Sequence, residues 1–142
     1  MAPVAEVLAD PAFRMMLAAD PVAVREALAR IAASGPMAAL SADHRATAEI
    51  VLAEVLNNIA EHAYAGAAGD IAIILRTTPA GLACQLSDQG REMPGGSPPL
   101  GILPEEEFPE GGFGWYLIRS LTQGLTYQRK AGQNLLHFVI PA

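Results

Sequence analysis

The chain has 142 residues, which is the size of one domain with one hydrophobic core. Hydrophobic residues make up 51% of it and charged residues 17%, a composition that favours a folded globular protein over a disordered one. The formal net charge is -6 and the basic residues are scattered, which argues against the basic surface that a nucleic-acid-binding protein needs.

The cysteine content and the N-terminal residues predict where the protein works. Cys84 is the single cysteine, so no intrachain disulfide forms, and Glu6, Asp10 and Pro11 interrupt the apolar run that a signal peptide requires. No uncharged apolar run reaches the roughly 20 residues of a membrane span. We therefore expect a cytoplasmic protein with no membrane partner. Cys84 lies on a predicted strand and is expected to be inert core.

Apolar periodicity and turn residues predict the elements in chain order. Residues 1–12 are expected to form an N-terminal leader, and residues 13–142 a single domain. The predicted order is strand 13–19, helix 21–34, helix 42–64, strand 71–78, strand 82–87, helix 114–121, strand 125–130 and strand 134–140. Asp20 and Pro21 suit the start of the first helix, and Gly35-Pro36 its end.

This order of elements implies the α+β class. We expect a two-layer sandwich in which the helices cover one face of a mixed, mainly antiparallel sheet. The segment 89–112 has no periodic apolar pattern, is rich in glycine and proline, and carries the acidic stretch Glu105-Glu106-Glu107. A loop of this length inside a compact domain is typical of a lid or a binding loop.

The long predicted helix carries one polar stripe. Glu54, Asn58 and Glu61 are spaced by four and three residues, so they fall on one narrow face. A helix packed on a sheet normally turns its polar side to water, and that is the simpler explanation of the stripe taken alone. Asn57 and Asn58 are poor choices for an exposed helix interior, because asparagine has a weak helix propensity. An amide carbonyl at this place is therefore a candidate ligand.

Two glycine-containing motifs follow along the chain. Asp88-Gln89-Gly90 places a carboxylate at the end of a strand, although an isolated motif of this kind is most often a turn. Gly111-Gly112-Phe113-Gly114 precedes an apolar helix, whose free N–H groups attract anions. Alone, that string is equally well explained as a hinge followed by a helix start.

Together, these motifs resemble a known family. They occur in the order Glu54-x-x-x-Asn58-x-x-x-His62-Ala63-Tyr64, then Asp88-x-Gly90, then Gly111-Gly112-Phe113-Gly114. This order resembles the ATP-binding fold shared by histidine kinases, gyrase and the MutL family, and within it most closely the small anti-sigma-factor serine/threonine kinases. The resemblance covers roughly residues 13–140 and includes the stretch from Tyr127 to Asn134, where the family has a strand pair, a glycine turn and an asparagine.

The resemblance implies a function for the carboxylates and the amide. Asn58 would coordinate a Mg²⁺ ion that bridges the nucleotide phosphates, and Glu54 would orient or deprotonate the attacking hydroxyl. Asp88 would accept a hydrogen bond from the adenine amino group. His62 is a candidate neighbour of the phosphates, although a histidine at a helix C-terminus also caps carbonyls.

The resemblance also implies functions for the glycines. Gly90 would let the base or the ribose approach the backbone, while Gly112 and Gly114, with Gly111 and Phe113 in the same string, would line the phosphate tail. The family often has a second glycine two residues after the first, and here that position is Glu92.

The expected function is that of an ATP-binding anti-sigma factor. It would transfer the γ-phosphoryl group of ATP to a serine or threonine of an antagonist protein and would also sequester a sigma factor. The resemblance also implies a homodimer, a state that the family often adopts. A binding-only regulatory module with the same fold is the alternative, supported by Glu92. A detached ATPase domain of a two-component sensor is a third reading.

Overall fold

The computed structural model describes residues 12–65, 67–100 and 113–142. The strands are β1 (Phe13–Ala18), β2 (Asp70–Thr78), β3 (Gly81–Asp88), β4 (Gln123–Lys130) and β5 (Gln133–Pro141). The helices are α2 (Pro21–Ala32), α3 (Gly35–Ala38), α4 (Ala42–Asn58) and α5 (Phe113–Leu121), with a π-helical turn η1 (Ile59–Ala63) and a 3-10 turn η2 (Pro94–Gly96). The predicted leader lies almost wholly outside the described residues.

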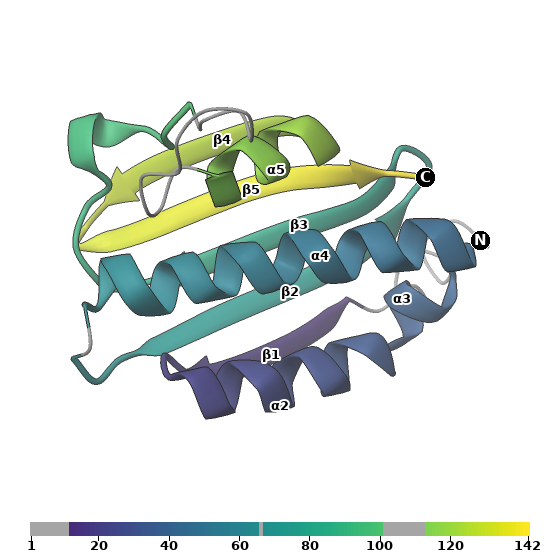
Figure 1. The fold of residues 1–142 in the computed structure, drawn as a ribbon, viewed down its shortest axis with the longest axis horizontal. Helices are drawn as coiled ribbons and strands as arrows, with labels where there is room; N and C mark the ends of the chain where they lie inside the picture. Colours follow the sequence, from purple (N-terminus) through teal and green to yellow (C-terminus); the bar gives the residue numbers. More distant parts are fainter. Residues whose placement is uncertain (1–11, 66, 101–112) are drawn as a thin grey trace, which may run out of the picture.

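The strands form one sheet in the order β1-β2-β3-β5-β4, and the helices lie on one of its faces (Figure 1). The predicted α+β two-layer architecture is therefore confirmed. The prediction allowed a mixed sheet, but every strand pairing within the described part of the chain is antiparallel. No helix in that part is long and apolar enough to cross a membrane.

The first two long helices begin at side-chain caps that the sequence supplies. Asp20 accepts a hydrogen bond from the backbone N–H of Ala23 at 2.9 Å, and Ser41 accepts one from the N–H of His44 at 3.2 Å. Between these helices the prediction was incomplete. Gly35-Pro36 does not only end α2 but also opens the short helix α3, because proline is favoured in the first turn of a helix.

The core lies between the sheet and α4. Alternate residues of the strands point toward the helices, and α4 contributes five buried residues from one side. Among the fully buried side chains of the described residues are Leu52, Leu56, Ile71, Ile73, Leu75, Leu82, Leu86, Ile118, Phe138 and Ile140. Each large aliphatic side chain buried in this way stabilises the fold by about 1.5–3 kcal/mol.

The predicted helix 42–64 is α-helical only as far as Asn58. Over Ile59–Ala63 the chain forms a π-helical turn, in which the N–H of Tyr64 donates to the carbonyl of Ile59 five residues earlier, at 3.3 Å. A π-turn inside a helix rotates the following residues out of the α-helical register, and such turns are frequent at functional sites. It therefore changes which side chains share a face with Asn58.

Two tight turns complete the sheet. Gly81 has a φ of 137°, and a side chain on it would lie 2.1 Å from the carbonyl oxygen of Ile140. At the β4–β5 hairpin, Ala131 and Gly132 both have positive φ, which matches the twist of antiparallel strands. Strand β4 begins at Gln123, two residues before the predicted start, and a register shift lies between Gln123 and Thr126.

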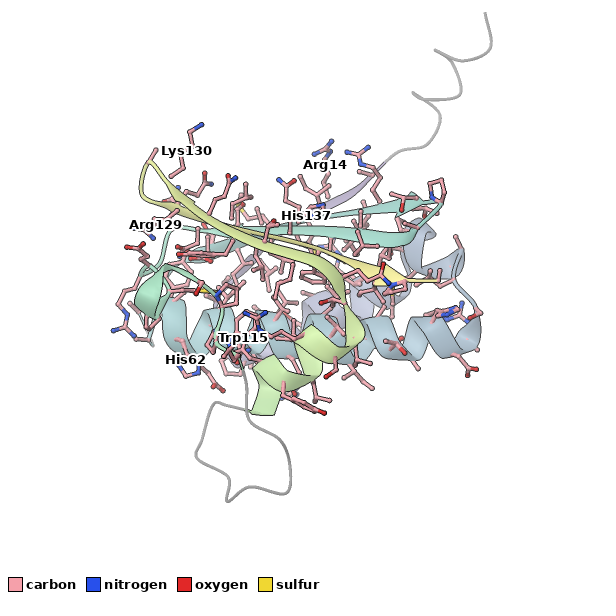
Figure 2. All side chains as sticks on the ribbon, turned by 90° about the horizontal axis from the view of Figure 1, so that it is seen from above. Arg14, His62, Trp115, Arg129, Lys130 and His137 are labelled. Atoms are coloured by element: carbon pink, nitrogen blue, oxygen red, sulfur yellow. The ribbon has the colours of Figure 1, made fainter. Side chains whose placement is uncertain are left out.

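Figure 2 shows the two faces of the sheet from the side. Arg14, His137 and Lys130 lie on the face away from the helices, whereas His62 and Trp115 lie on the helical side. The predicted helical motifs thus share one side of the sheet with Trp115.

The prediction from this packing concerns Cys84. Its side chain is fully buried on β3, and this burial raises the pKa of the thiol well above its ordinary value. Because only a thiolate is nucleophilic, a thiol reagent should label the native protein far more slowly than the protein in concentrated urea. The labelling rate is measured from the absorbance of the released dye. Equal rates in the two solutions would contradict the placement of Cys84 in the core.

Candidate functional site

A cavity of about 350 Å³ lies where the end of α4, the end of β3 and the β4–β5 hairpin meet. This size is within the range of small-molecule sites. Its apolar wall includes Val55, Ile59, Met93, Trp115 and Leu136, and its polar groups are those of Asn58, His62, Asp88, Arg91, Glu92, Tyr127 and Asn134. An apolar slot with a few polar groups at its ends suits a flat heterocycle that carries a polar tail.

Asp88 is the buried acid of this cavity. It is the last residue of β3 and is only 6% exposed. Its Oδ1 accepts two hydrogen bonds, from the N–H of Gly90 and from Nδ2 of Asn134, both at 2.8 Å. No described residue donates to its second oxygen, so Asp88 keeps one acceptor for a ligand in the cavity it lines.

Asn58 places an unpaired amide in the same cavity. Its Nδ2 is buried and has no hydrogen-bond partner among the described residues. A buried polar atom without a partner costs free energy, and such an atom in a cavity is a good candidate for a ligand contact. Rotation of the amide exchanges Nδ2 with Oδ1, so this end of the side chain can donate to a phosphate or coordinate a cation.

Glu54 lies one turn before Asn58, and both side chains reach the first turn of α5. A side chain on Gly114 would lie 2.7 Å from Oε2 of Glu54 and 3.6 Å from Nδ2 of Asn58. The glycine at 114 therefore gives room to the Glu54 carboxylate. Of the predicted stripe, Asn58 lines the cavity, Glu54 lies beside it at Gly114, and Glu61, inside the π-turn, is exposed to solvent.

Gly90 is required by a close backbone contact, whatever its expected contact with a ligand. A side chain on Gly90 would lie 2.5 Å from the carbonyl oxygen of Ala63. Glycine therefore lets the π-turn pack directly against the backbone at residue 90. The same carbonyl accepts a hydrogen bond from the N–H of Arg91 at 2.7 Å, and the Arg91 guanidinium donates to the carbonyl of His62 at 2.9 Å. Gly90 thus joins the helical layer to the end of β3.

The remaining predicted residues are placed in part. His62 lines the cavity, but its side chain is largely exposed and lies 3.8 Å from the carboxylate of Glu61. Gly111, Gly112 and the acidic stretch Glu105-Glu106-Glu107 lie outside the described residues. Phe113 begins α5.

The sequence reasoning gave no ligand-binding role to several cavity residues. Trp115 was assigned to packing, and it is 5% exposed in the core while also lining the cavity. Tyr127 and Asn134 entered only as part of the resemblance, without a function. The available signal was a buried strand position occupied by asparagine, which is uncommon without a polar partner.

The described residues offer a metal ion no complete set of charged ligands. The described parts of the chain contain no group of three histidine, cysteine, aspartate or glutamate side chains that could hold one. Mg²⁺ commonly binds through one or two protein oxygens together with water and substrate phosphates. A single amide oxygen of Asn58 fits that mode of binding.

A comparison with protein families identifies the kind of domain. The model of the histidine kinase-like ATPase domain matches residues 17–140, nearly the whole chain. The chain belongs to this family. A comparison with curated proteins finds no match.

Membership of the histidine kinase-like ATPase family indicates the general ligand of the domain. Domains of this family bind ATP, typically with Mg²⁺. Asp88 and Asn58 both line the cavity described above.

The site makes a prediction about Gly90. Gly90→Ala should lower the free energy of unfolding by about 1–3 kcal/mol, because the new methyl group meets backbone atoms rather than a movable side chain. Gly35→Ala is the matched control, since nothing lies within 4 Å of the added carbon at that position. Urea unfolding of both variants checks this; equal stability of the two would refute the contact between Gly90 and Ala63.

Proposed function

We propose that this domain is an ATP-dependent serine/threonine kinase of the anti-sigma-factor class. It would phosphorylate a small antagonist protein and would sequester a sigma factor in the cytoplasm. The observation that carries the proposal is the placement of Asp88 and the unpaired Asn58 amide in one cavity, with Glu54 one helical turn from Asn58. The order of motifs along the chain, which resembles this class of kinases, supports the choice of acceptor and partners.

The cavity suits the adenine base at the Asp88 end. The unpaired oxygen of Asp88 would accept a hydrogen bond from the exocyclic amino group of adenine. The apolar side chains of Ile59, Met93 and Leu136 line the same cavity and would cover the faces of the ring. The triphosphate would then extend toward Asn58 and the first turn of α5, whose free N–H groups favour anions.

Asn58 would hold Mg²⁺ together with the phosphates. The ion, when bound, would neutralise charge on the nucleotide and orient the γ-phosphoryl group. The neutral amide leaves the full charge of the ion available to the phosphates.

Glu54 would act on the acceptor hydroxyl. The serine or threonine oxygen attacks the γ-phosphorus, and the bond from phosphorus to the β–γ bridging oxygen breaks with its electron pair leaving on ADP. The hydroxyl proton passes to the Glu54 carboxylate. Such transfer depends mainly on positioning and charge stabilisation, which suits a carboxylate that Gly114 admits to the first turn of α5.

A second candidate function is a binding module that keeps the nucleotide site without transfer. Glu92 favours it, because this carboxylate lines the cavity at the position where the related kinases often have a glycine. A carboxylate near a triphosphate is repulsive, and the cost reaches several kcal/mol only where both groups are desolvated. Glu92 is exposed, so solvent screens most of this repulsion.

The kinase proposal predicts a separation of binding from transfer. Glu54→Gln should lower the rate of transfer to the antagonist by about 10²–10⁴, because the proton acceptor is lost. Its affinity for Mg-ATP should stay within about threefold of the wild-type value. Transfer is followed as phosphorylated partner on a phosphate-affinity gel, and binding by calorimetry.

Glu61→Gln is the matched control, because it removes the same charge from an exposed position outside the cavity. It should leave both quantities unchanged. Unchanged transfer in Glu54→Gln would remove Glu54 from the mechanism, and a tight complex that never yields phosphorylated partner would favour the binding module. Loss of the phosphate in acid would point to phosphohistidine and to a two-component reaction instead.

A further inference from the structure

A cluster of three side chains on the β4–β5 hairpin is joined to Asp88 through Asn134. It consists of Tyr127, Arg129 and Asn134, and we refer to it as the hairpin clamp. Asn134 is 5% exposed and lies directly opposite Asp88 in the pairing of β3 with β5. Burying an amide and a carboxylate side by side costs free energy of folding unless both groups are hydrogen-bonded. We therefore follow each hydrogen bond of this pair.

The amide of Asn134 has a fixed orientation. Its Oδ1 accepts hydrogen bonds from the hydroxyl of Tyr127 and from the guanidinium of Arg129, the latter at 3.1 Å. A guanidinium has only donors, so turning the amide over would set its N–H groups against those of Arg129. The clamp therefore keeps Nδ2 of Asn134 pointed toward Asp88.

The two hydrogens of this Nδ2 have separate acceptors. One bond runs to Oδ1 of Asp88 and one to the carbonyl of Arg91, each at 2.8 Å. With the N–H of Gly90 also bound to Oδ1, that oxygen is fully engaged. The carboxylate is thus held in one rotation, in which its other oxygen remains without a donor from the described residues.

The clamp also holds the segment that follows Asp88. The Arg129 guanidinium donates to the carbonyl of Gly90 at 2.6 Å, and the N–H of Met93 donates to the hydroxyl of Tyr127 at 3.0 Å. Met93 lines the cavity, so the same three side chains position both the acceptor and part of the apolar wall.

We infer that the hairpin clamp, through Asn134, sets the preference of this site for adenine over guanine, an inference that rests on the proposed nucleotide site. A carboxylate oxygen held in one place accepts from the amino group of adenine, whereas guanine presents a carbonyl oxygen at the corresponding position and leaves both acceptors unpaired. A carboxylate free to rotate would discriminate less. Asn134, Arg129 and Tyr127 are positioning residues in this account, because they act through Asp88.

The test compares Mg-ATP with Mg-GTP binding by calorimetry. Asn134→Ala should lower the ratio of ATP to GTP affinity by about tenfold or more, and Arg129→Ala by about threefold. A purely structural role would weaken both nucleotides equally and leave the ratio unchanged. Arg129→Ala decides the matter if the buried variant fails to fold, because Arg129 is exposed and its removal spares the core.

Lys130→Ala is the matched control. It removes the neighbouring positive charge, whose side chain points away from the helices at the tip of the hairpin (Figure 2). The ratio should stay within about twofold of the wild-type value. The inference would be overturned by an unchanged ratio in Arg129→Ala, or by a ratio that falls as far in Lys130→Ala as in Arg129→Ala. If the wild type still binds ATP in that case, the proposed nucleotide site stands.

A wild-type protein that binds neither nucleotide overturns the proposed function and the adenine preference together. In that case, hydrogen exchange in the absence of nucleotide still tests whether the hairpin clamp holds the segment after Asp88. The Met93 amide should exchange about tenfold faster in Asn134→Ala than in Lys130→Ala, because its acceptor Tyr127 loses its partner on Asn134. Equal exchange in the two variants would show that the clamp holds nothing.

Discussion

The cavity depends on the hydrogen bond that joins the end of the long helix to the segment after β3. The carbonyl of Ala63 accepts from the N–H of Arg91 at 2.7 Å, and Gly90 has no side chain to hold the two backbones apart. The π-helical turn brings this carbonyl to Arg91 while Asn58, just before the turn, keeps its place in the cavity wall. The two ends of the cavity, which we propose bind the base and the phosphates, therefore share one junction.

The charge of the cavity wall explains why a bound triphosphate would need a divalent cation. The charged side chains of the described cavity wall are two carboxylates, Asp88 and Glu92, and one guanidinium, Arg91, which already donates to a backbone carbonyl. A triphosphate approaching a protein of net charge -6 meets repulsion that these residues do not offset. An amide at residue 58 can hold Mg²⁺ without adding a further negative charge to the site.

The amino-acid sequence was sufficient for the sheet and the long helices, because alternation and 3.6-residue periodicity leave a readable pattern. It was also sufficient to bring Glu54 and Asn58 together, since four residues make about one turn. It did not reveal the π-turn, because that turn depends on a tertiary contact with the segment after β3. The hairpin clamp was equally hidden, because Asn134 and Asp88 are 46 residues apart and only the strand register sets them side by side. The contact between Gly90 and the Ala63 carbonyl was hidden for the same reason, because it joins residues far apart in the sequence.

The most direct measurement of the central claim is a calorimetric titration of Mg-ATP into the wild-type protein, Asn58→Ala and Asn57→Ala. The two asparagines are neighbours of identical chemistry, but Asn57 is exposed and only Asn58 lines the cavity. We expect wild type and Asn57→Ala to bind with similar affinity, and Asn58→Ala to bind at least about tenfold more weakly. Equal binding by all three proteins would contradict the assignment of this cavity as the nucleotide site. So would the absence of binding by the wild type at millimolar ATP.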